Sequence, residues 1–397
     1  MNARFTELEG ELHATASRMT GLSDFGGPDY RPGLGELLRA LDTDCRFSAA
    51  GRQLAHATVL GTLIARLHAE EGWKRHPECR VLVIRKPLII TGIPRTGTTA
   101  LHKLLSMDHQ FQGLEHWLSE SPMMRPPRAS WPDIPEYRAS IAALESFFEV
   151  MPEMRTAHDI VADEVDECLE VLRQSFVTNR FASGMPVPSY DRWFRGQDER
   201  GSYRRYAQVL KLIGASEPEK RWLLKNPGHL AQLRALFEVF PDACIVQTHR
   251  DPVKALPSLC STLLMSRRMF EGDAARAELI GPRECEYWGT AVEAAQAERD
   301  KRPRQFFDVD HGSVYRDPLG TVRAIYDFFG LALGETAEAR MRGWIAENPP
   351  GKHGEHRYDV RAFGISAEDI GRRFAGYVSR HGPWDRMRRS SEQRSTA

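Results

Sequence analysis

Short apolar runs, each followed by a segment with helical spacing, recur along the chain from residue 88 onward. The first run covers 88–91 and ends at a glycine, and similar runs follow at 221–225, 243–248 and 305–309. Such runs, bounded by turn residues, are typical of strands in a parallel sheet that is buried on both faces. The three later runs precede helical patterns at 229–239, 252–266 and 317–329. This alternation predicts an α/β fold, a P-loop-like parallel sheet flanked by helices.

The region before the first predicted strand has a helical pattern instead. Apolar residues recur at helical spacing over 5–19, 34–42 and 50–71, which predicts amphipathic helices packed on a core. We therefore expect a helical N-terminal region over 1–85 and an α/β domain over 86–385. The last residues, 386–397, are charged or small, and we predict a disordered tail there.

A long insertion, at about 107–200, separates the first predicted strand from the second. It contains a proline-rich stretch at 121–135 and helical patterns at 137–150 and 163–178. Long connections of this kind in compact domains commonly form lids or the walls of substrate sites. We expect most of its aromatic residues to be core or lid residues, and a subset to line an apolar acceptor pocket.

Composition narrows the class of protein. The 397 residues include 54 basic and 54 acidic ones, so the formal net charge is zero, which argues against a nucleic-acid partner. No apolar run is long enough for a membrane-spanning helix, and the first residues lack the apolar core of a signal peptide. The six cysteines are scattered without a C-x-x-C pair, and no histidine pattern matches a metal motif. We expect a cytoplasmic protein without disulfides and without a metal site; nothing in the sequence indicates its oligomeric state.

A glycine-containing loop, Gly92-Ile93-Pro94-Arg95-Thr96-Gly97-Thr98-Thr99, follows the first predicted strand and opens a helix. It matches the phosphate-binding frame G-x-x-x-x-G-K-[ST] except that Thr98 replaces the lysine. Glycines let backbone N–H groups converge on a phosphate, and the following helix N-terminus adds partial positive charge. The missing lysine disfavours γ-phosphoryl transfer from a triphosphate–Mg²⁺ complex. Arg95 offers a planar cation instead. Such a loop suits a donor substrate with one short anionic bridge better than it suits a triphosphate–Mg²⁺ complex.

The loop and several later segments resemble the sulfotransferases that use 3′-phosphoadenosine 5′-phosphosulfate (PAPS), in particular the bacterial group with a G-x-P-R-T-G-T-T loop. The resemblance covers most of the chain in order. It includes the segments Trp222-Leu223-Leu224-Lys225-Asn226-Pro227-Gly228-His229-Leu230, Ile245 to Pro252 with Pro257-Ser258-Leu259, Asp317 to Val322, and Lys352 to Tyr358.

The resemblance implies which residues hold the donor. Its loop would bind the 5′-phosphosulfate through Pro94, Arg95, Thr96, Gly97, Thr98 and Thr99. Arg250 and Ser258 would bind the 3′-phosphate, in agreement with the rule that ligands lie at the carboxyl ends of strands in such sheets. Lys225 would reach the transferred group and neutralise the leaving oxygen. Lys352 and Arg357 would belong to a basic loop over the 3′ side of the nucleotide.

The chain departs from the family pattern in two places. Ala100 stands where cytosolic relatives have a tryptophan that stacks on adenine, and 311–314 differs from the usual Y-x-D-L pattern. Adenine recognition is therefore unassigned, and Tyr315 is a candidate to compensate.

Several residues are candidates for the general base, which must accept the proton of the acceptor hydroxyl. Glu115 and His116 rank first, because their spacing after the loop helix resembles that of the glutamate base in tyrosylprotein sulfotransferases. Glu164 and Glu167 come next, on the expectation that they share one face of the helix predicted over 163–178. His229 ranks third, because it is displaced from the histidine position of the cytosolic enzymes.

The sequence thus predicts a metal-independent sulfotransferase that moves a sulfuryl group from PAPS to a hydroxyl, or less readily an amine, of a small or medium organic acceptor. Adenosine 3′,5′-bisphosphate (PAP) would be the second product, and Arg95 and Lys225 would stabilise the transferring group. Two alternatives stay open at this point: a nucleotide-dependent kinase with a degenerate P-loop, and a non-catalytic nucleotide-binding protein on the same fold.

Overall fold

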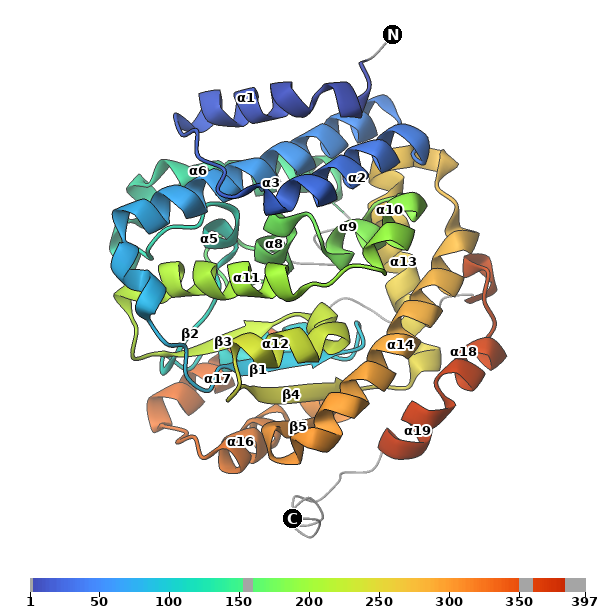
Figure 1. Ribbon diagram of the computed structural model, residues 1–397. Coiled ribbons are helices and arrows are strands. Elements are labelled where there is room, and N and C mark those ends of the chain that lie inside the picture. The colour runs from blue at the N-terminus through green and yellow to red at the C-terminus, as the bar shows by residue number, and fades with distance from the viewer. Residues whose placement is uncertain (1–2, 153–159, 350–359, 383–397) are drawn as a thin grey trace. The chain divides into compact units, whose positions relative to one another are not determined.

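The computed structural model describes residues 3–152, 160–349 and 360–382 (Figure 1). It divides into two compact units. The helical unit comprises Met1–Ile84, Leu114–Glu219 and Thr262–Arg276. The sheet unit comprises Arg85–Gly113, Lys220–Ser261 and Ala277–Ala397. The segment 114–219, which covers most of the predicted insertion, thus groups with the N-terminal region.

The sheet unit is built on a five-stranded parallel sheet of order β2-β3-β1-β4-β5. Its strands are β1 (Leu88–Gly92), β2 (Phe111–Gln112), β3 (Arg221–Lys225), β4 (Cys244–His249) and β5 (Phe306–Asp310). The four strands expected from the apolar runs are confirmed. β2 was not predicted, because two residues are too short for any periodicity to be visible.

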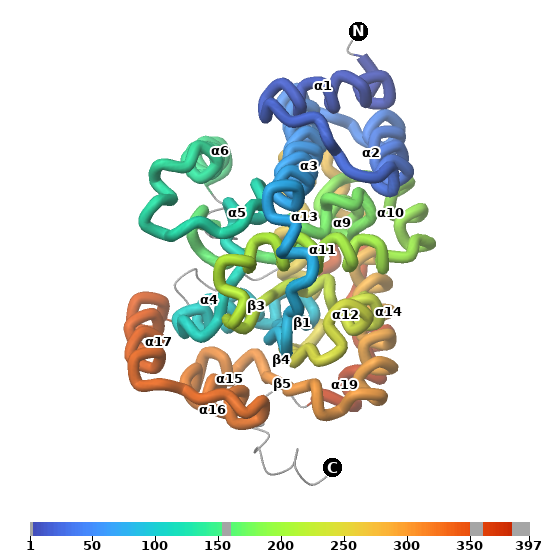
Figure 2. Tube along the Cα trace, turned by 60° about the vertical axis from the view of Figure 1, so that its left-hand side comes forward, coloured from blue at the N-terminus to red at the C-terminus, as the bar shows by residue number. Residues whose placement is uncertain are grey.

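Helices cover both faces of this sheet, as Figure 2 shows. One side carries α4 (Thr98–Leu105), α15 (His311–Arg316), α16 (Pro318–Phe329) and α17 (Glu335–Glu347). Apolar residues of these helices form one buried cluster with Leu88 and Ile90 of β1 and Val246 of β4. The other side carries α12 (Leu233–Val239) and α14 (Ile280–Lys301), where Phe237 packs on Phe306 of β5 with ring centroids 5.9 Å apart.

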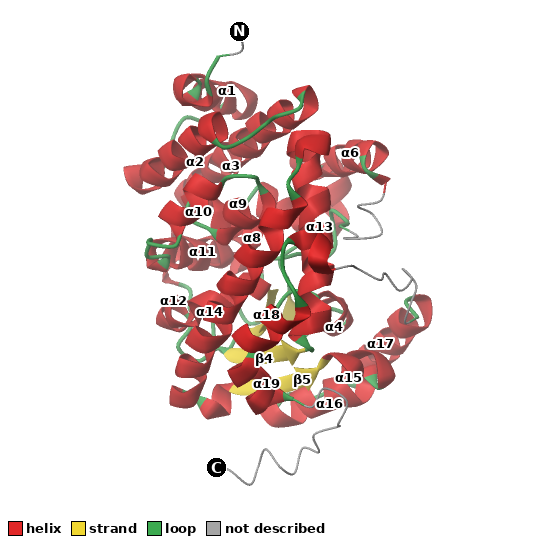
Figure 3. Ribbon diagram, turned by 90° about the vertical axis from the view of Figure 1, so that its right-hand side faces the viewer, coloured by secondary structure: helices red, strands yellow, loops and turns green. Residues whose placement is uncertain are grey.

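Two short helices complete the sheet unit, α18 (Ala367–Arg373) and α19 (Ala375–His381) (Figure 3). The long helix α13 (Pro252–Glu271) begins directly after β4, and its first residues, up to Ser261, belong to this unit. Each parallel strand thus delivers its carboxyl end to one edge of the sheet, where the ligands of such folds lie.

The helical unit consists of short and long helices with an apolar core. Its helices are α1 (Glu9–Thr20), α2 (Arg31–Thr43), α3 (Ala49–Arg75), α5 (His116–Glu120), α6 (Pro135–Val150), α8 (Leu169–Leu172), α9 (Asn179–Gly184), α10 (Pro188–Phe194) and α11 (Arg200–Ile213). The side chain of Ser48 caps α3 by accepting a hydrogen bond from Gly51 N at 2.9 Å. Several aromatic residues of the predicted insertion are core residues, among them Trp117, Trp131, Phe148 and Phe194, which are all buried.

The helix predicted over 163–178 is wrong for most of its length. Only 169–175 are helical, as α8 and a following 3₁₀ turn. The acidic segment before α8 pairs instead with the backbone of residues 114–116. His116 N donates to Glu164 O at 3.1 Å, and Asp166 N donates to Leu114 O at 2.8 Å. Backbone pairing with a distant segment overrides the local periodicity, so Glu164 and Glu167 do not share a helical face.

No helix in the described part of the chain combines the length and the apolar character that crossing a membrane requires.

Candidate active site

The loop after β1 has a strained, left-handed backbone on both sides of Thr96. Arg95 has φ 68° and Gly97 has φ 90°, and a positive φ is uncommon for a residue other than glycine. Gly92, with φ 153°, lies so close to β4 that a Cβ there would be 2.5 Å from the carbonyl oxygen of Thr248. Turns of alternating hand bring successive N–H groups together into an anion-binding concavity, and strain of this kind clusters at functional sites.

Thr96 holds this loop in place. Its hydroxyl donates to the carbonyl oxygen of Ile93 at 2.7 Å and lies 2.5 Å from Oγ1 of Thr248. The Thr248 hydroxyl in turn donates to Thr91 O at 3.3 Å. Because Thr96 is fully buried, we infer that its side chain shapes the loop through these contacts.

The predicted phosphate-binding residues come together from three segments. Arg95 Nε donates to Ser258 Oγ at 3.2 Å, and Arg250 Nη1 donates to the carbonyl oxygen of Arg95 at 2.9 Å. Arg250 follows the carboxyl end of β4, and Ser258 lies in α13. The result is two guanidinium groups and a hydroxyl at one end of the sheet, which is a set of donors suited to phosphate or sulfate.

Lys225, the last residue of β3, lies beside the same loop. It is 1 % exposed, and its Nζ donates to Thr99 Oγ1 at 3.2 Å. The end of β3 is tied to β1, because Thr91 Oγ1 donates to the carbonyl oxygen of Asn226 at 3.0 Å. A buried ammonium held at the N-terminus of α4 adds positive charge where the loop would hold an anion.

Two aromatic side chains of α15 pack against Gly97. A Cβ at that glycine would be 3.5 Å from His311 Cδ2 and 3.8 Å from Tyr315 Cε2, and the two rings are 4.9 Å apart. Burial, together with the charges of the nearby Arg250 and Arg95, lowers the pKa of His311 to about 4. Sequence reasoning did not select His311; its position directly after β5, at the carboxyl edge of the sheet, was the available signal.

The candidate bases Glu115 and His116 belong to the helical unit, as do Glu164 and Glu167, whereas the loop belongs to the sheet unit. Glu115 accepts two hydrogen bonds from Arg125, at 3.2 and 2.9 Å. His116 Nδ1 lies 2.7 Å from Asp166 Oδ2, and its Nε2 lies 3.5 Å from Glu120 Oε1. Burial lowers the pKa of His116, but the hydrogen bonds and charges of Asp166 and Glu120 outweigh it and raise the pKa to about 10.

His116 is therefore expected to stay protonated across the neutral range, which argues against it as a proton acceptor. In a pH titration followed by NMR, its ring resonances should stay constant from about pH 5 to 9. Because the folded pKa lies above the unfolded value, the interaction stabilises the fold fully below about pH 6.5 and is lost as pH rises through about 10.

The variant D166N should lower the pKa of His116 by about 1–3 pH units, since it removes a carboxylate in direct contact. The matched variant D163N, in which the lost carboxylate is bound to Arg128, should leave it unchanged. A His116 that titrates near its ordinary pKa in the unmodified protein would contradict the assignment.

His229 lies in a 3₁₀ turn after β3 and is fully buried. Burial lowers its pKa to about 3, so it is neutral and a weak proton acceptor at neutral pH. Lys352 and Arg357, the predicted basic loop over the nucleotide, lie outside the described residues.

A model of the sulfotransferase family matches residues 87–335 of the chain. The omega-hydroxy-beta-dihydromenaquinone-9 sulfotransferase Stf3 of Mycobacterium bovis is 24 % identical over 373 residues, covering 85 % of this chain and 91 % of that protein. The crystal structure of the sulfotransferase STF1 from Mycobacterium tuberculosis superposes with a TM-score of 0.83 at 37 % identity, covering 94 % of this chain and 100 % of that one. The sulfotransferase STF9 from Mycobacterium avium gives a TM-score of 0.83 at 26 % identity, with 94 % and 96 % covered.

Proposed function

The chain belongs to the sulfotransferase family, and from this premise we propose that it transfers a sulfuryl group from PAPS to a hydroxyl of a small organic acceptor. One observation carries the choice of donor: Arg95, Arg250 and Ser258 meet beside the glycine loop, with Lys225 at the same loop. This group of cations and hydroxyls is suited to the anionic groups of PAPS, which supports the choice of donor.

The 5′-phosphosulfate is proposed to lie in the loop. Backbone N–H groups of 95–99 and the N-terminus of α4 supply fixed dipoles, and Arg95 supplies a full charge. The 3′-phosphate is proposed to lie against Arg250 and Ser258. The rings of Tyr315 and His311 lie beside Gly97, and we propose them as aromatic neighbours of the nucleotide.

Transfer requires in-line attack by the acceptor oxygen on sulfur. A new S–O bond forms, the S–O bond to the 5′-phosphate breaks, and the electron pair leaves with the phosphate oxygen. Lys225 is proposed to neutralise that leaving oxygen, because its buried ammonium acts in a low dielectric where a charge contributes most. The proton acceptor stays a prediction among Glu115, Glu164 and Glu167, since the protonation of His116 and the burial of His229 argue against those two.

For the acceptor, we propose an alcohol on an apolar molecule. The support comes from the two relatives that are named omega-hydroxy-beta-dihydromenaquinone-9 sulfotransferase. A cytoplasmic location is proposed on the pattern of cysteines in the sequence.

Two measurements test the proposal. Calorimetry with PAP in the presence of a chelator should show tight binding without a divalent cation, whereas a degenerate kinase would require Mg²⁺ and ATP. Mass spectrometry of acceptor panels incubated with PAPS should then show sulfated products, with hydroxylated isoprenoids included beside phenols and sterols. PAP binding without turnover on any acceptor would favour a non-catalytic nucleotide-binding protein.

A further inference from the structure

The end of β4 is hydrogen-bonded to the C-terminal helix α19 through one phenol. The hydroxyl of Tyr377 lies 2.9 Å from Nδ1 of His249, the residue directly before Arg250. Both Tyr377 and His249 are buried. The neighbour of the residue that we place on the 3′-phosphate is thus held by a side chain far along the sequence.

The hydrogen bonds continue into β5 and α14. His249 Nε2 lies 2.8 Å from Asp308 Oδ1, and Arg299 donates to both oxygens of that carboxylate, at 2.6 and 2.5 Å. If Tyr377 donates to Nδ1, His249 carries its proton on Nε2 and donates to Asp308, so each group has a compatible role. The hydrogen bonds therefore run without a break from Arg299 through Asp308 and His249 to Tyr377.

This cluster does not have the character of a metal site, although His249, Asp308 and His381 have ligand atoms within 4.8 Å of one another. The guanidinium of Arg299 already occupies both oxygens of Asp308, and both nitrogens of His249 are in hydrogen bonds. The rings of His249 and His381 are stacked, with centroids 4.3 Å apart and planes 17° apart. Stacked rings aim their nitrogens past each other rather than at a common point.

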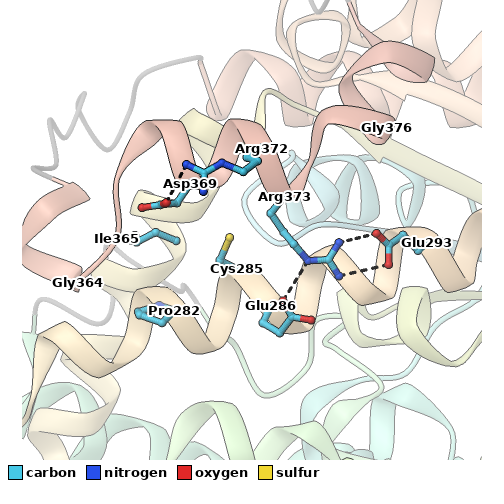
Figure 4. A pocket seen from close by; sticks show the side chains of 10 residues that line it. All are labelled: Pro282, Cys285, Glu286, Glu293, Gly364, Ile365, Asp369, Arg372, Arg373 and Gly376. Carbon is cyan, nitrogen blue, oxygen red and sulfur yellow. Dashed lines mark hydrogen bonds and ion pairs between the residues drawn. The ribbon is translucent and has the colours of Figure 1, made fainter.

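Arg373, the last residue of α18, holds this C-terminal pair of helices on α14 (Figure 4). Its guanidinium pairs with Glu286 at 3.1 Å and with Glu293 at 2.5 Å. It passes over Gly289, where a Cβ would lie 2.5 Å from Arg373 Nε. Arg373, Glu286 and Glu293 also border a cavity of about 660 Å³. Because α19 follows directly, this anchor determines where Tyr377 stands.

We propose that Tyr377 is a positioning residue for nucleotide recognition: it holds His249, and with it the adjoining backbone of Arg250, so that the guanidinium meets the 3′-phosphate. The inference rests on the proposed function of Arg250. Without the hydroxyl, Nδ1 of the buried His249 loses a partner, and such a group moves until it finds another, which shifts the adjoining backbone of Arg250. The guanidinium, which is held on the Arg95 carbonyl oxygen at 2.9 Å, would move with that backbone.

The test is calorimetry with PAP and with 5′-AMP, which lacks the 3′-phosphate. In Y377F the dissociation constant for PAP should rise about 10-fold, the change expected for one hydrogen bond, while that for 5′-AMP stays constant. The control is Y326F, which removes another buried phenol of the sheet unit, hydrogen-bonded to Asp108 at 2.8 Å, and should change neither constant. In an R250A background, Y377F should have no further effect on PAP binding.

The outcomes separate the inference from the function on which it rests. If the unmodified protein prefers PAP to 5′-AMP but Y377F keeps that preference, the positioning role is wrong and the assignment of Arg250 stands. If Y377F weakens both nucleotides equally, Tyr377 is merely structural and the inference is overturned. If the unmodified protein binds both nucleotides equally, the assignment of Arg250 fails and the inference fails with it.

Discussion

Replacing Arg250 with alanine should weaken PAP binding by about 10- to 100-fold while changing the affinity for 5′-AMP by less than about 3-fold. Hydrogen bonds from a charged donor to phosphate contribute about 1.5–3 kcal/mol each, which corresponds to this range. The selectivity arises because 5′-AMP has no group for Arg250 to hold. Calorimetry on both nucleotides measures the two constants directly.

The control for this substitution is R316A. Arg316 also adds positive charge near the loop, since it lowers the pKa of His311, but its side chain is 49 % exposed and pairs with Asp310 at 3.4 Å. A general loss of positive field would therefore appear in both variants. If R250A weakens PAP and 5′-AMP by the same factor, Arg250 supports the loop through its bond to Arg95 and does not read the 3′-phosphate.

The residues of the site that follow the carboxyl ends of the parallel strands could be predicted from the sequence. Apolar runs place β1, β3 and β4, and parallel strands deliver the residues that follow them to one edge, so Arg95, Lys225 and Arg250 were expected together. The structure does bring the loop, Ser258 and these cations together within the sheet unit. Their roles in binding and transfer stay predictions, because geometry alone does not assign chemistry.

Side-chain contacts between distant segments could not be predicted in the same way. Local periodicity in the sequence does not indicate such pairs. Examples are the contacts of Thr96 with Thr248, of His116 with Asp166, and of Tyr377 with His249. The wrong helix over 163–178 has the same origin: the acidic segment satisfies its backbone by pairing with 114–117, which helical spacing cannot reveal.

A formal net charge of zero is compatible with a strongly anionic ligand. Positive charge is concentrated near the loop, as the low pKa of His311 indicates. Burial is the largest cause of the lowering of this pKa to about 4, and the charges of Arg250 and Arg95 are the next largest. An anion bound among these cations would oppose that effect. Equal numbers of acidic and basic residues therefore argue against a broadly basic surface, but they are compatible with a small site in which positive charge is concentrated.

Replacing Lys225 with methionine should lower the rate of the chemical step by about 10²- to 10³-fold, the range for loss of one group that stabilises transition-state charge. Methionine has nearly the length of lysine, so it fills the buried site and leaves the packing of β3 intact. Single-turnover assays with radiolabelled PAPS and an acceptor from the screen measure this step. The affinity for PAP, measured by calorimetry, should fall far less than the rate.

The control is K254M, the same substitution at an exposed lysine whose charge lowers the pKa of His311, and it should change the single-turnover rate by less than about 3-fold. Because each variant removes one ammonium, the comparison separates the effect of position from the effect of charge. Lys225 contacts Thr99 in the loop, where the leaving oxygen is proposed to lie. If K225M binds PAP poorly but transfers at the normal rate once saturated, the ammonium serves ground-state binding, and another donor must neutralise the leaving group.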